Sequence, residues 1–373
     1  MPHDTSRDPI RRIAINTGGG DAPGLNAVIR ASVLAALGQG WECVGIRDGY
    51  NGLLDPGAYP EGGLMPLGRR EVRGVTHLGG TIIGTTNRGD PLAYPVELPD
   101  GTVTQVDRSD EVVEAIRAAD IDALIAIGGD GSMRIANRLS EKGVPIVGVP
   151  KTIDNDLEET SVTFGFDTAV AFATECIDRL HTTAEAHDRL IVVEVMGRYA
   201  GWIALHSGLA GSADAILIPE IPYDLVRVAE KIAEREAAGR HFSIIVVAEG
   251  AHAVGGERSV ISEEPGRERR LGGIGQRVAY ELAELTGKET RTVVLGHLLR
   301  GGGPTTLDRI LSLRFGAAAV RALREGCFGC MVALDPPEVR YVPLAKVTGR
   351  MKCVPTDSDT VRTVRDLGIS LGD

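Results

Sequence analysis

The chain has 373 residues, long enough for two domains, and its 43% hydrophobic and 24% charged residues are typical of a globular protein. A formal net charge of −11 without a polybasic run argues against nucleic acid or an anionic membrane as the main partner. No apolar run is long enough to span a membrane, and residues 1–12 lack the apolar core of a signal peptide, so we expect a cytoplasmic protein.

Short apolar runs alternate with helical patterns through most of the chain. The first predicted strand, residues 12–16, leads through a glycine-rich turn into a predicted helix over about 24–37. Further buried strands are predicted at residues 123–127, 145–149, 190–195, 215–218, 243–248 and 292–295. Because their apolarity is continuous rather than alternating, they suit parallel strands that are covered on both faces. Strands that alternate with helices predict an α/β fold with doubly wound parallel sheets.

The same alternation suggests how the chain is divided. We expect a first domain over residues 1–150, a second over 151–310, and a C-terminal helix and tail over 311–373, although the chain can recross between them. Residues 91–107, with Leu-Pro-Asp-Gly-Thr near their middle, are interpreted as a hairpin or loop insertion. The tail from about residue 335 onward has weak periodicity, and we assign it no catalytic role.

The chain has five cysteines, of which Cys327 and Cys330 form a Cys-x-x-Cys pair. An odd count without a secretory signal suggests reduced thiols. A redox pair or half of a zinc site is conceivable, but no second pair of cysteines or histidines has a suitable spacing. We therefore interpret these residues as ordinary thiols near a helix end.

Two glycine-rich clusters follow predicted strands, where doubly wound sheets bind their ligands. The first, Gly-Gly-Gly-Asp at residues 18–21, can bring backbone N–H groups to a phosphate at a helix N-terminus, although a turn without a ligand would also explain it. The second, Gly-Gly-Asp-Gly-Ser at residues 128–132, adds Asp130 as an oxygen ligand for Mg²⁺ and Ser132 as a helix N-cap. It is typical of several kinase families and does not identify the acceptor.

Charged residues follow other predicted strands. Asp154 and Asp156 come soon after the strand at 145–149, where carboxylates are costly unless they are used or paired. One can accept the proton of an attacking hydroxyl while the other positions it or reaches the metal; structural turns bonded by Asp and Asn side chains are the alternative. The cations at or near strand ends, which can bind phosphate, are Arg189, Arg198, Arg291, Arg300 and His297.

The motifs occur in a specific order along the chain. They are Gly-Gly-Asp-Ala-Pro-Gly-Leu-Asn-Ala, Gly-Gly-Asp-Gly-Ser, Pro-Lys-Thr-Ile-Asp-Asn-Asp, Val-Glu-Val-Met-Gly-Arg and Arg-Thr-Val-Val-Leu-Gly-His-Leu-Leu-Arg-Gly-Gly. As a set they resemble the 6-phosphofructokinases of the bacterial, single-length type, over about residues 13–322. The resemblance implies two Rossmann-like domains, the first for nucleotide and Mg²⁺ and the second for fructose 6-phosphate. It also implies a homotetramer, or a homodimer, whose subunits share active sites.

The resemblance assigns the phosphoryl-transfer roles to five residues. Asp154 matches the general base that activates the sugar 1-hydroxyl, and Asp130 matches the carboxylate associated with Mg²⁺. Arg198 matches the residue that stabilises charge on the transferred group, which Thr152 and Asp156 flank. The residues matched to the nucleotide-phosphate loops are Gly20, Gly129, Gly131 and Ser132.

Further matched residues would hold the sugar phosphate. They are Met196 and Gly197 at the sugar site, Glu249 at the sugar hydroxyls, His297 and Arg300 at the 6-phosphate, and Arg189 and Arg291 from a neighbouring subunit. The implied reaction is the phosphorylation of fructose 6-phosphate to fructose 1,6-bisphosphate, a step of glycolysis.

Two residues bear on the phosphoryl donor. Gly131 is the ATP-like choice, because a side chain here, typically Asp in pyrophosphate enzymes, would crowd and repel the α-phosphate of ATP. Lys151 is the choice more common in pyrophosphate enzymes. The combination resembles a mixed subgroup whose members with Gly at this position use ATP. We predict ATP as the donor, with a pyrophosphate-dependent phosphotransferase as the alternative.

The sequence departs from the family pattern at three further positions. The family's arginine at the nucleotide falls on Asn87, and we expect Arg88 to serve instead. Two arginines of the effector site fall on Leu34 and His181, so we expect nearly hyperbolic kinetics that ADP and phosphoenolpyruvate do not alter. Another phosphorylated acceptor, or a non-catalytic sugar-phosphate sensor, remains as a rival; a sensor would be expected to have lost Asp130 or Asp154.

Overall fold

The computed structural model describes residues 9–262 and 270–373, which form two compact units. Unit 1 contains Met1–Thr152, Leu157–Gly165 and Gly301–Arg350, and unit 2 contains Ile153–Asp156, Phe166–Arg300 and Met351–Asp373. The chain crosses between the units after residues 152, 156, 165, 300 and 350. The first crossing lies beside the expected boundary at residue 150. The segment 311–373, which we expected as one helix and tail, is instead divided between the units at residue 350.

Unit 1 is built on a seven-stranded sheet in the order β15-β14-β7-β6-β1-β2-β3. Its strands are β1 (Arg12–Thr17), β2 (Glu42–Ile46), β3 (Leu64–Pro66), β6 (Ala123–Gly128), β7 (Ile146–Pro150), β14 (Cys330–Asp335) and β15 (Glu338–Pro343). The central strands pair in parallel, and the two edge strands β3 and β15 pair antiparallel to their neighbours. Every residue of β6 and β7 is buried, as the continuous apolarity of both segments predicts.

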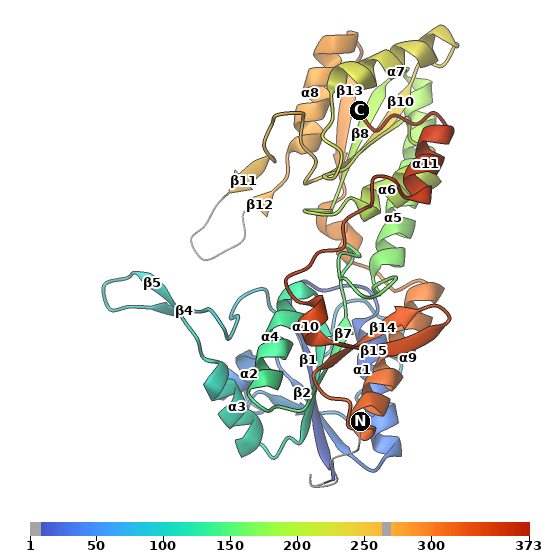
Figure 1. Ribbon diagram of the computed structural model, residues 1–373. Helices are drawn as coiled ribbons and strands as arrows, with labels where there is room; N and C mark the ends of the chain where they lie inside the picture. Colours follow the sequence, from blue (N-terminus) through green and yellow to red (C-terminus); the bar gives the residue numbers. More distant parts are fainter. Residues whose placement is uncertain (1–8, 263–269) are drawn as a thin grey trace. The chain divides into compact units, whose positions relative to one another are not determined.

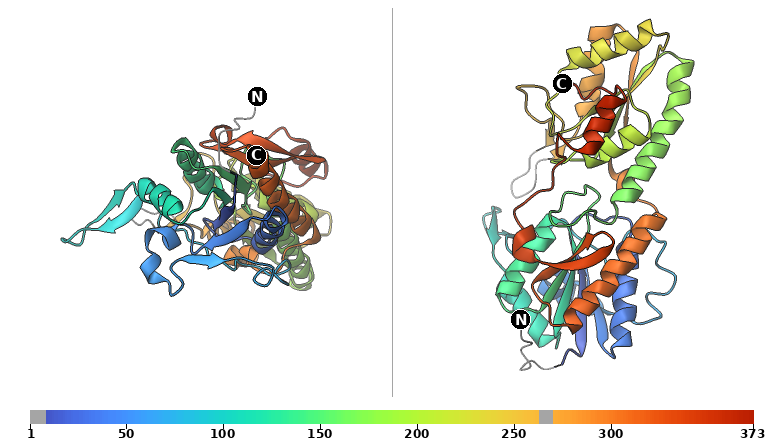
Figure 2. Two further views of the ribbon diagram at one scale, coloured as in Figure 1. Left: turned by 90° about the horizontal axis from the view of Figure 1, so that it is seen from below. Right: turned by 45° about the vertical axis from the view of Figure 1, so that its right-hand side comes forward.

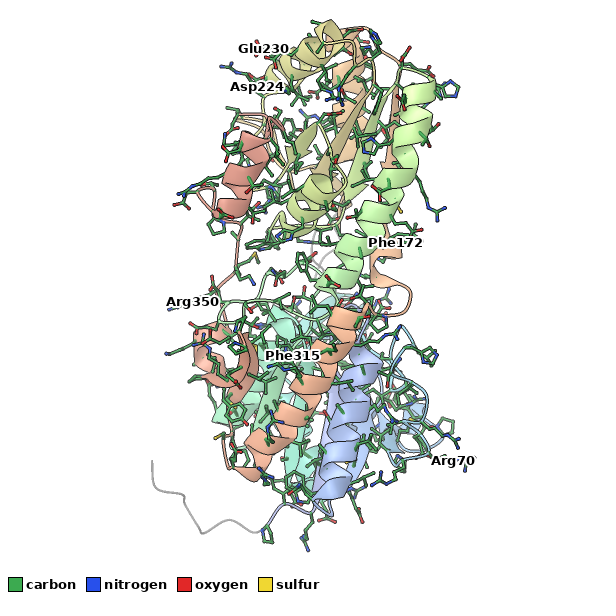
Figure 3. All side chains as sticks on the ribbon, turned by 90° about the vertical axis from the view of Figure 1, so that its right-hand side faces the viewer. Arg70, Phe172, Asp224, Glu230, Phe315 and Arg350 are labelled. Carbon is green, nitrogen blue, oxygen red and sulfur yellow. The ribbon has the colours of Figure 1, made fainter. Side chains whose placement is uncertain are left out.

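Helices cover both faces of this sheet (Figure 1). The helices of unit 1 are α1 (Leu25–Gly38), α2 (Asn51–Leu54), η1 (Pro56–Ala58), α3 (Ser109–Ala118), α4 (Asp130–Glu141), α9 (Thr306–Arg324) and α10 (Leu344–Val347). On one face, Ile13 and Ile15 of β1 pack with α1 and α9; Figure 3 shows α9, which carries Phe315, alongside α1. On the other face, Ala14 packs with apolar residues of α3, α4 and α10.

The order of the strands creates a switch point between β1 and β6. The chain leaves β1 for β2 on one side, and it leaves β6 for β7 on the other. The loops after β1 and β6 therefore adjoin, and the amide of Gly18 donates to the carbonyl of Ile127 at 2.9 Å. Ligands of doubly wound sheets bind at such a point.

The expected insertion at residues 91–107 contains an antiparallel hairpin of β4 (Tyr94–Glu97) and β5 (Val103–Val106). Figures 1 and 2 show it extending away from the rest of unit 1. Arg108 anchors its base by lying over the Tyr94 ring at 4.6 Å and by pairing with Glu111.

Unit 2 has a four-stranded parallel sheet in the order β13-β8-β10-β9. Its strands are β8 (Leu190–Val195), β9 (Ala215–Leu217), β10 (Ser243–Ala248) and β13 (Thr290–Val294), with a separate pair β11 (Val260–Ser262) and β12 (Arg270–Leu271). Its helices are α5 (Phe166–Ala186), α6 (Trp202–Ala210), α7 (Leu225–Ala237), α8 (Ile274–Thr286), η2 (Gly296–Arg300) and α11 (Asp359–Asp366). The pairs α5 with α6, and α7 with α8, cover opposite faces. The predicted α/β class with two doubly wound parallel-rich sheets is confirmed.

The structure also bears on two expectations outside the site, which concern membrane spans and the Cys327–Cys330 pair. Among the described residues, no helix is both long enough and apolar enough to cross a bilayer. Cys327 and Cys330 carry free thiols at the start of β14, and the Cys330 thiol contacts the Cys327 carbonyl at 3.0 Å. Burial raises the pKa of Cys330 to about 12, so its thiol stays protonated and is a poor nucleophile.

Candidate active site

In unit 1, three loops at the carboxyl ends of β1, β6 and β7 lie together. The side chain of Ser132, near the start of α4, fills the space next to Gly18, where an added Cβ would lie 2.6 Å from its Oγ. Lys151, buried directly after β7, donates from Nζ to the carbonyl of Gly20 and from its amide to the carbonyl of Gly128 at 2.9 Å. The structure thus brings together the two predicted glycine clusters and the predicted donor-specificity lysine.

Asp130 is the first residue of α4, with Gly129 as the N-cap. A helix N-terminus carries partial positive charge and free amide donors, which favour anions such as phosphate. The Oδ1 oxygen of Asp130 is shielded from solvent. Within the described part of the chain, no group of three or more His, Cys, Asp or Glu side chains could hold a metal. A Mg²⁺ ion beside a nucleotide usually takes one or two carboxylate ligands and completes its coordination with phosphate and water, and Asp130 could supply such a carboxylate.

The loop that carries Arg88 packs against the first glycine cluster. Gly19 donates its amide to the carbonyl of Thr86 at 3.1 Å, and Thr85 Oγ1 donates to the carbonyl of Gly19 at 2.7 Å. Arg88 itself is exposed, two residues from these contacts. Its role at the nucleotide therefore stays a prediction.

In unit 2, the predicted residues Arg198, Glu249, His297 and Arg300 follow the carboxyl ends of adjacent strands. Arg198 lies three residues after β8, Glu249 follows β10 directly, and His297 and Arg300 belong to η2 after β13. The amide of Gly250 donates to the carbonyl of Gly197 at 3.0 Å, so the loops after β8 and β10 are joined. Gly197 has φ +137°, and a Cβ there would lie 2.8 Å from the Ala200 carbonyl, which explains the glycine.

Asp154 lies in the short segment of unit 2 between two crossings, and its Oδ1 is shielded from solvent. Burial is the largest cause that raises the pKa of Asp154, to about 7, and the negative charges of Asp156 and Glu249 act in the same direction. Arg300 and Arg198 oppose the rise. The predicted base therefore interacts electrostatically with four other predicted residues. A carboxylate that titrates near neutrality is suited to general-base catalysis.

Positive charge is available beside this acid. The Nε of Arg300 is buried, and no hydrogen-bond partner for it occurs among the residues that the structure describes. A buried guanidinium donor without a partner is costly, and an anionic ligand would satisfy it. Glu249 is next to the same cations: burial raises its pKa, while Arg198 and Arg300 lower it.

The structure does not place the predicted residues Arg189 and Arg291 near Asp154, Arg198 and Arg300. Arg189 precedes β8 and Arg291 is the second residue of β13, so both lie at the amino ends of strands whose carboxyl ends carry Arg198 and His297. A six-residue strand such as β8 separates its ends by roughly 17 Å. Both arginines pair with Glu289, Arg189 at 3.0 Å. Within one chain they cannot reach the acid cluster.

Two polar residues escaped the sequence analysis. Asn16 interrupts the apolar strand β1, and both polar atoms of its side chain are buried without a hydrogen-bond partner in the described ranges. That interruption was a usable signal, because a buried amide needs partners. Lys352 lies in the tail that we left without a catalytic role, yet its Nζ is 3.0 Å from Oδ1 of Asn155. Nothing in the local sequence pattern indicates this long-range contact.

Comparisons with known proteins agree on the family and differ in the phosphoryl donor. The family model for Phosphofructokinase matches residues 12–323. An ATP-dependent 6-phosphofructokinase of Chloroflexus aurantiacus is 52% identical over 363 residues, which cover 97% of this chain and 98% of that relative. A pyrophosphate–fructose 6-phosphate 1-phosphotransferase of Amycolatopsis mediterranei is 50% identical over 349 residues, which cover 93% and 97%. The solved structure of Pichia pastoris phosphofructokinase in the T-state aligns with a TM-score of 0.77 and 30% identity, covering 92% of this chain and 36% of that longer one.

Proposed function

Since the chain belongs to the phosphofructokinase family and is thus a phosphotransferase with an alcohol acceptor, we propose that it transfers a phosphoryl group from ATP to the 1-hydroxyl of fructose 6-phosphate. The observation that carries the proposal is the environment of Asp154, a shielded acid with a pKa of about 7 beside Arg198 and Arg300. A base of this pKa can take the hydroxyl proton at neutral pH. Fixed cations next to it suit a reaction that moves a negatively charged group.

The donor side of the proposal rests on the three loops of unit 1. Backbone amides of the glycine clusters and the N-terminus of α4 would hold the nucleotide phosphates, with Gly20, Gly129 and Ser132 in these loops. Asp130 fits a Mg²⁺ ion that is otherwise held by phosphate and water, and the ion when bound would neutralise charge on the phosphates. Thr152 ends a stretch of unit 1 two residues before Asp154.

The choice of ATP rests on Gly131. A Cβ at this position would meet no heavy atom within 4 Å in the described structure, so packing does not require a glycine here. Room for the nucleotide does explain it. Overall similarity does not separate the donors, because an ATP enzyme and a pyrophosphate enzyme are 52% and 50% identical to this chain. Lys151 bonds the carbonyl of Gly20, a role that is compatible with either donor.

On the acceptor side, we propose that Arg300 and His297 bind the 6-phosphate and that Glu249 binds sugar hydroxyls. The buried Nε of Arg300 provides a donor for this phosphate. Met196 and Gly197 would line the sugar. Arg198 would stabilise charge on the migrating group, and Asp156 would flank it.

The remote arginines support an oligomer with shared sites. Arg189 and Arg291 lie at the wrong strand ends to serve their own chain, so we propose that they complete the phosphate site of a neighbouring subunit in a homotetramer or homodimer.

One assay tests the donor, the acceptor and the catalytic base. Purified protein with fructose 6-phosphate and Mg²⁺ is offered ATP or pyrophosphate separately, and fructose 1,6-bisphosphate is measured. We expect product with ATP, and none from Asp154→Asn. Product with pyrophosphate alone would reverse the donor assignment, and binding of the sugar phosphate without turnover would favour a sensor.

A further inference from the structure

The C-terminal segment, residues 351–373, is part of unit 2. After Arg350, labelled in Figure 3, the chain enters this unit. Val361 and Val364 of helix α11 are buried, and Figure 2 shows this helix beside the other elements of unit 2. Ser370 then pairs in parallel with Ala215 of β9, and its amide and carbonyl bond Asp214 and Ile216 at 3.0 and 2.8 Å. The end of the segment is thereby fixed to the sheet.

The start of the segment contacts the short stretch that holds the predicted base. The amide of Lys352 donates to the carbonyl of Asp156 at 2.9 Å, and its Nζ is 3.0 Å from Oδ1 of Asn155. Asn155 is buried and has φ +52°, in the left-handed region that residues other than glycine rarely adopt. Asn adopts this region more readily than other residues with a side chain, and contacts from its surroundings hold it there. Lys352 supplies two of these contacts, one to the side chain of Asn155 and one to the carbonyl of the next residue, Asp156.

The same segment is bonded to the start of α6, which follows the turn that carries Arg198. Trp202 Nε1 donates to the carbonyl of Lys352 at 2.8 Å, and the Lys352 ammonium lies 5.5 Å from the centre of the Trp202 ring. Two residues on, the amide of Val354 donates to Glu220 at 2.8 Å, and Glu220 also accepts the amide of Gly201 at 3.0 Å. Residues 352–354 therefore link the base segment to the loop after β8.

We propose that Lys352 is a positioning residue for phosphoryl transfer, which sets the orientation of Asp154 by holding Asn155 in its left-handed conformation. This inference rests on the proposed function. Lys352 lies outside residues 12–323, which match the family model, and it is not among the groups that shift the pKa of Asp154 most. Its effect is therefore on geometry, and small misplacements of a catalytic group can lower turnover about 100-fold.

The kinetic test uses a double-mutant cycle. Lys352→Met keeps the apolar stem and removes the donors, and it should lower kcat about 10- to 100-fold with the KM for fructose 6-phosphate within about threefold. Lys352→Arg should recover most of the loss. Asn155→Gly adopts positive φ without the side-chain acceptor, so Lys352→Met should have little added effect in that background. Lys346→Met, at an exposed lysine of α10, is the matched control.

Several results would overturn the inference. One is an unchanged kcat in Lys352→Met. Another is a loss of kcat on adding Lys352→Met to Asn155→Gly that is as large as the loss in the wild-type background. If Lys352→Met does not fold, Lys352→Gln takes its place in the cycle. Hydrogen–deuterium exchange of the peptide spanning residues 153–156, in protein without ligands, should rise in the Lys352 variant. Unchanged exchange would contradict the inference, whether or not the wild type is active. A wild type that transfers phosphate from neither donor would reject the proposed function, but it would not by itself reject the role of Lys352 in holding Asn155.

Discussion

Replacing Asp154 by Asn should stabilise the folded protein above neutral pH while it abolishes turnover. Burial and the neighbouring carboxylates raise the pKa of Asp154 from its ordinary 3.8 to about 7 in the folded chain. The unfolded chain therefore loses this proton first as the pH rises. The group's contribution to stability is fully present below about pH 4 and is lost as the pH rises through about 7. Asn keeps the shape of the neutral acid and cannot ionise.

The size of the effect follows from the shift. Each unit of pKa difference is worth about 1.4 kcal/mol, so a rise of roughly three units corresponds to at most about 4 kcal/mol of unfolding free energy at pH 8. We expect about 2–4 kcal/mol, because the surroundings relax around an ionised group. For a chain of this length that is a rise in Tm of about 3–5 °C if it unfolds cooperatively.

Thermal unfolding of the wild type and Asp154→Asn, without ligands and at constant ionic strength, measures this difference from pH 4 to pH 9. The gain should fall below about 1 kcal/mol at pH 4, where Asp154 is protonated in the folded wild type and only partly ionised in the unfolded chain. Asp178→Asn, at an exposed position on α5, is the control and should show no such dependence. An Asp154→Asn variant that is less stable than the wild type at pH 8 would refute the reasoning. It would mean that attraction to Arg198 and Arg300 outweighs burial.

The remaining predictions concern activity. Gly131→Asp should lower kcat/KM for ATP at least about 100-fold by repelling the α-phosphate, with an unchanged Tm because no neighbour lies within 4 Å of a Cβ there. Arg198→Ala should lower kcat by about 100- to 1000-fold, whereas Arg300→Ala should mainly raise the KM for fructose 6-phosphate about 10-fold or more; equal effects on both constants would argue against these separate roles. The logarithm of kcat/KM should rise with unit slope up to about pH 7 and then level, and a profile that is flat from pH 5 would exclude Asp154 as the base. Saturation with fructose 6-phosphate should be hyperbolic and unaffected by ADP or phosphoenolpyruvate, since the ring of His181 is bonded to the carbonyl of Gly211 at 2.7 Å; a sigmoidal curve that ADP relieves would contradict this.

The strands that were predictable are those with unbroken apolar runs. Residues 190–195 form β8 as predicted, and residues 123–127 lie within β6. Strand β2 was missed because Gly45 weakens its pattern, although the side chain of Ile83 packs where a Cβ would be. The edge strand β15 was missed because all but one of its residues are exposed or half-buried and because it follows two prolines. The local sequence does not show which neighbouring strand an edge strand pairs with, although that pairing provides half of its environment.

The return of the chain to unit 1 after residue 300 was not predictable for a related reason. Helix α9 belongs there because Phe315 and Leu311 pack in the same core as Ile29 of α1, almost three hundred residues earlier. Helical periodicity shows that α9 has an apolar face, but not which sheet receives it.

In the candidate site, too, the sequence predicted the residue types but not their environment. Asp154, Asp130 and Arg198 could be named from the sequence because phosphoryl transfer needs an acid, an oxygen ligand for a cation and a fixed positive charge at strand ends. A pKa near neutrality could not be inferred, since its largest cause is the burial of Asp154, with the negative charges of Asp156 and Glu249 acting in the same direction. The contact of Lys352 with Asn155 joins residues almost two hundred positions apart. Proton transfer by Asp154 depends on the orientation of its carboxyl as much as on the residue type. The C-terminal segment, which contains no recognisable motif, can therefore affect the rate. The loss of kcat in Lys352→Met measures how large that effect is.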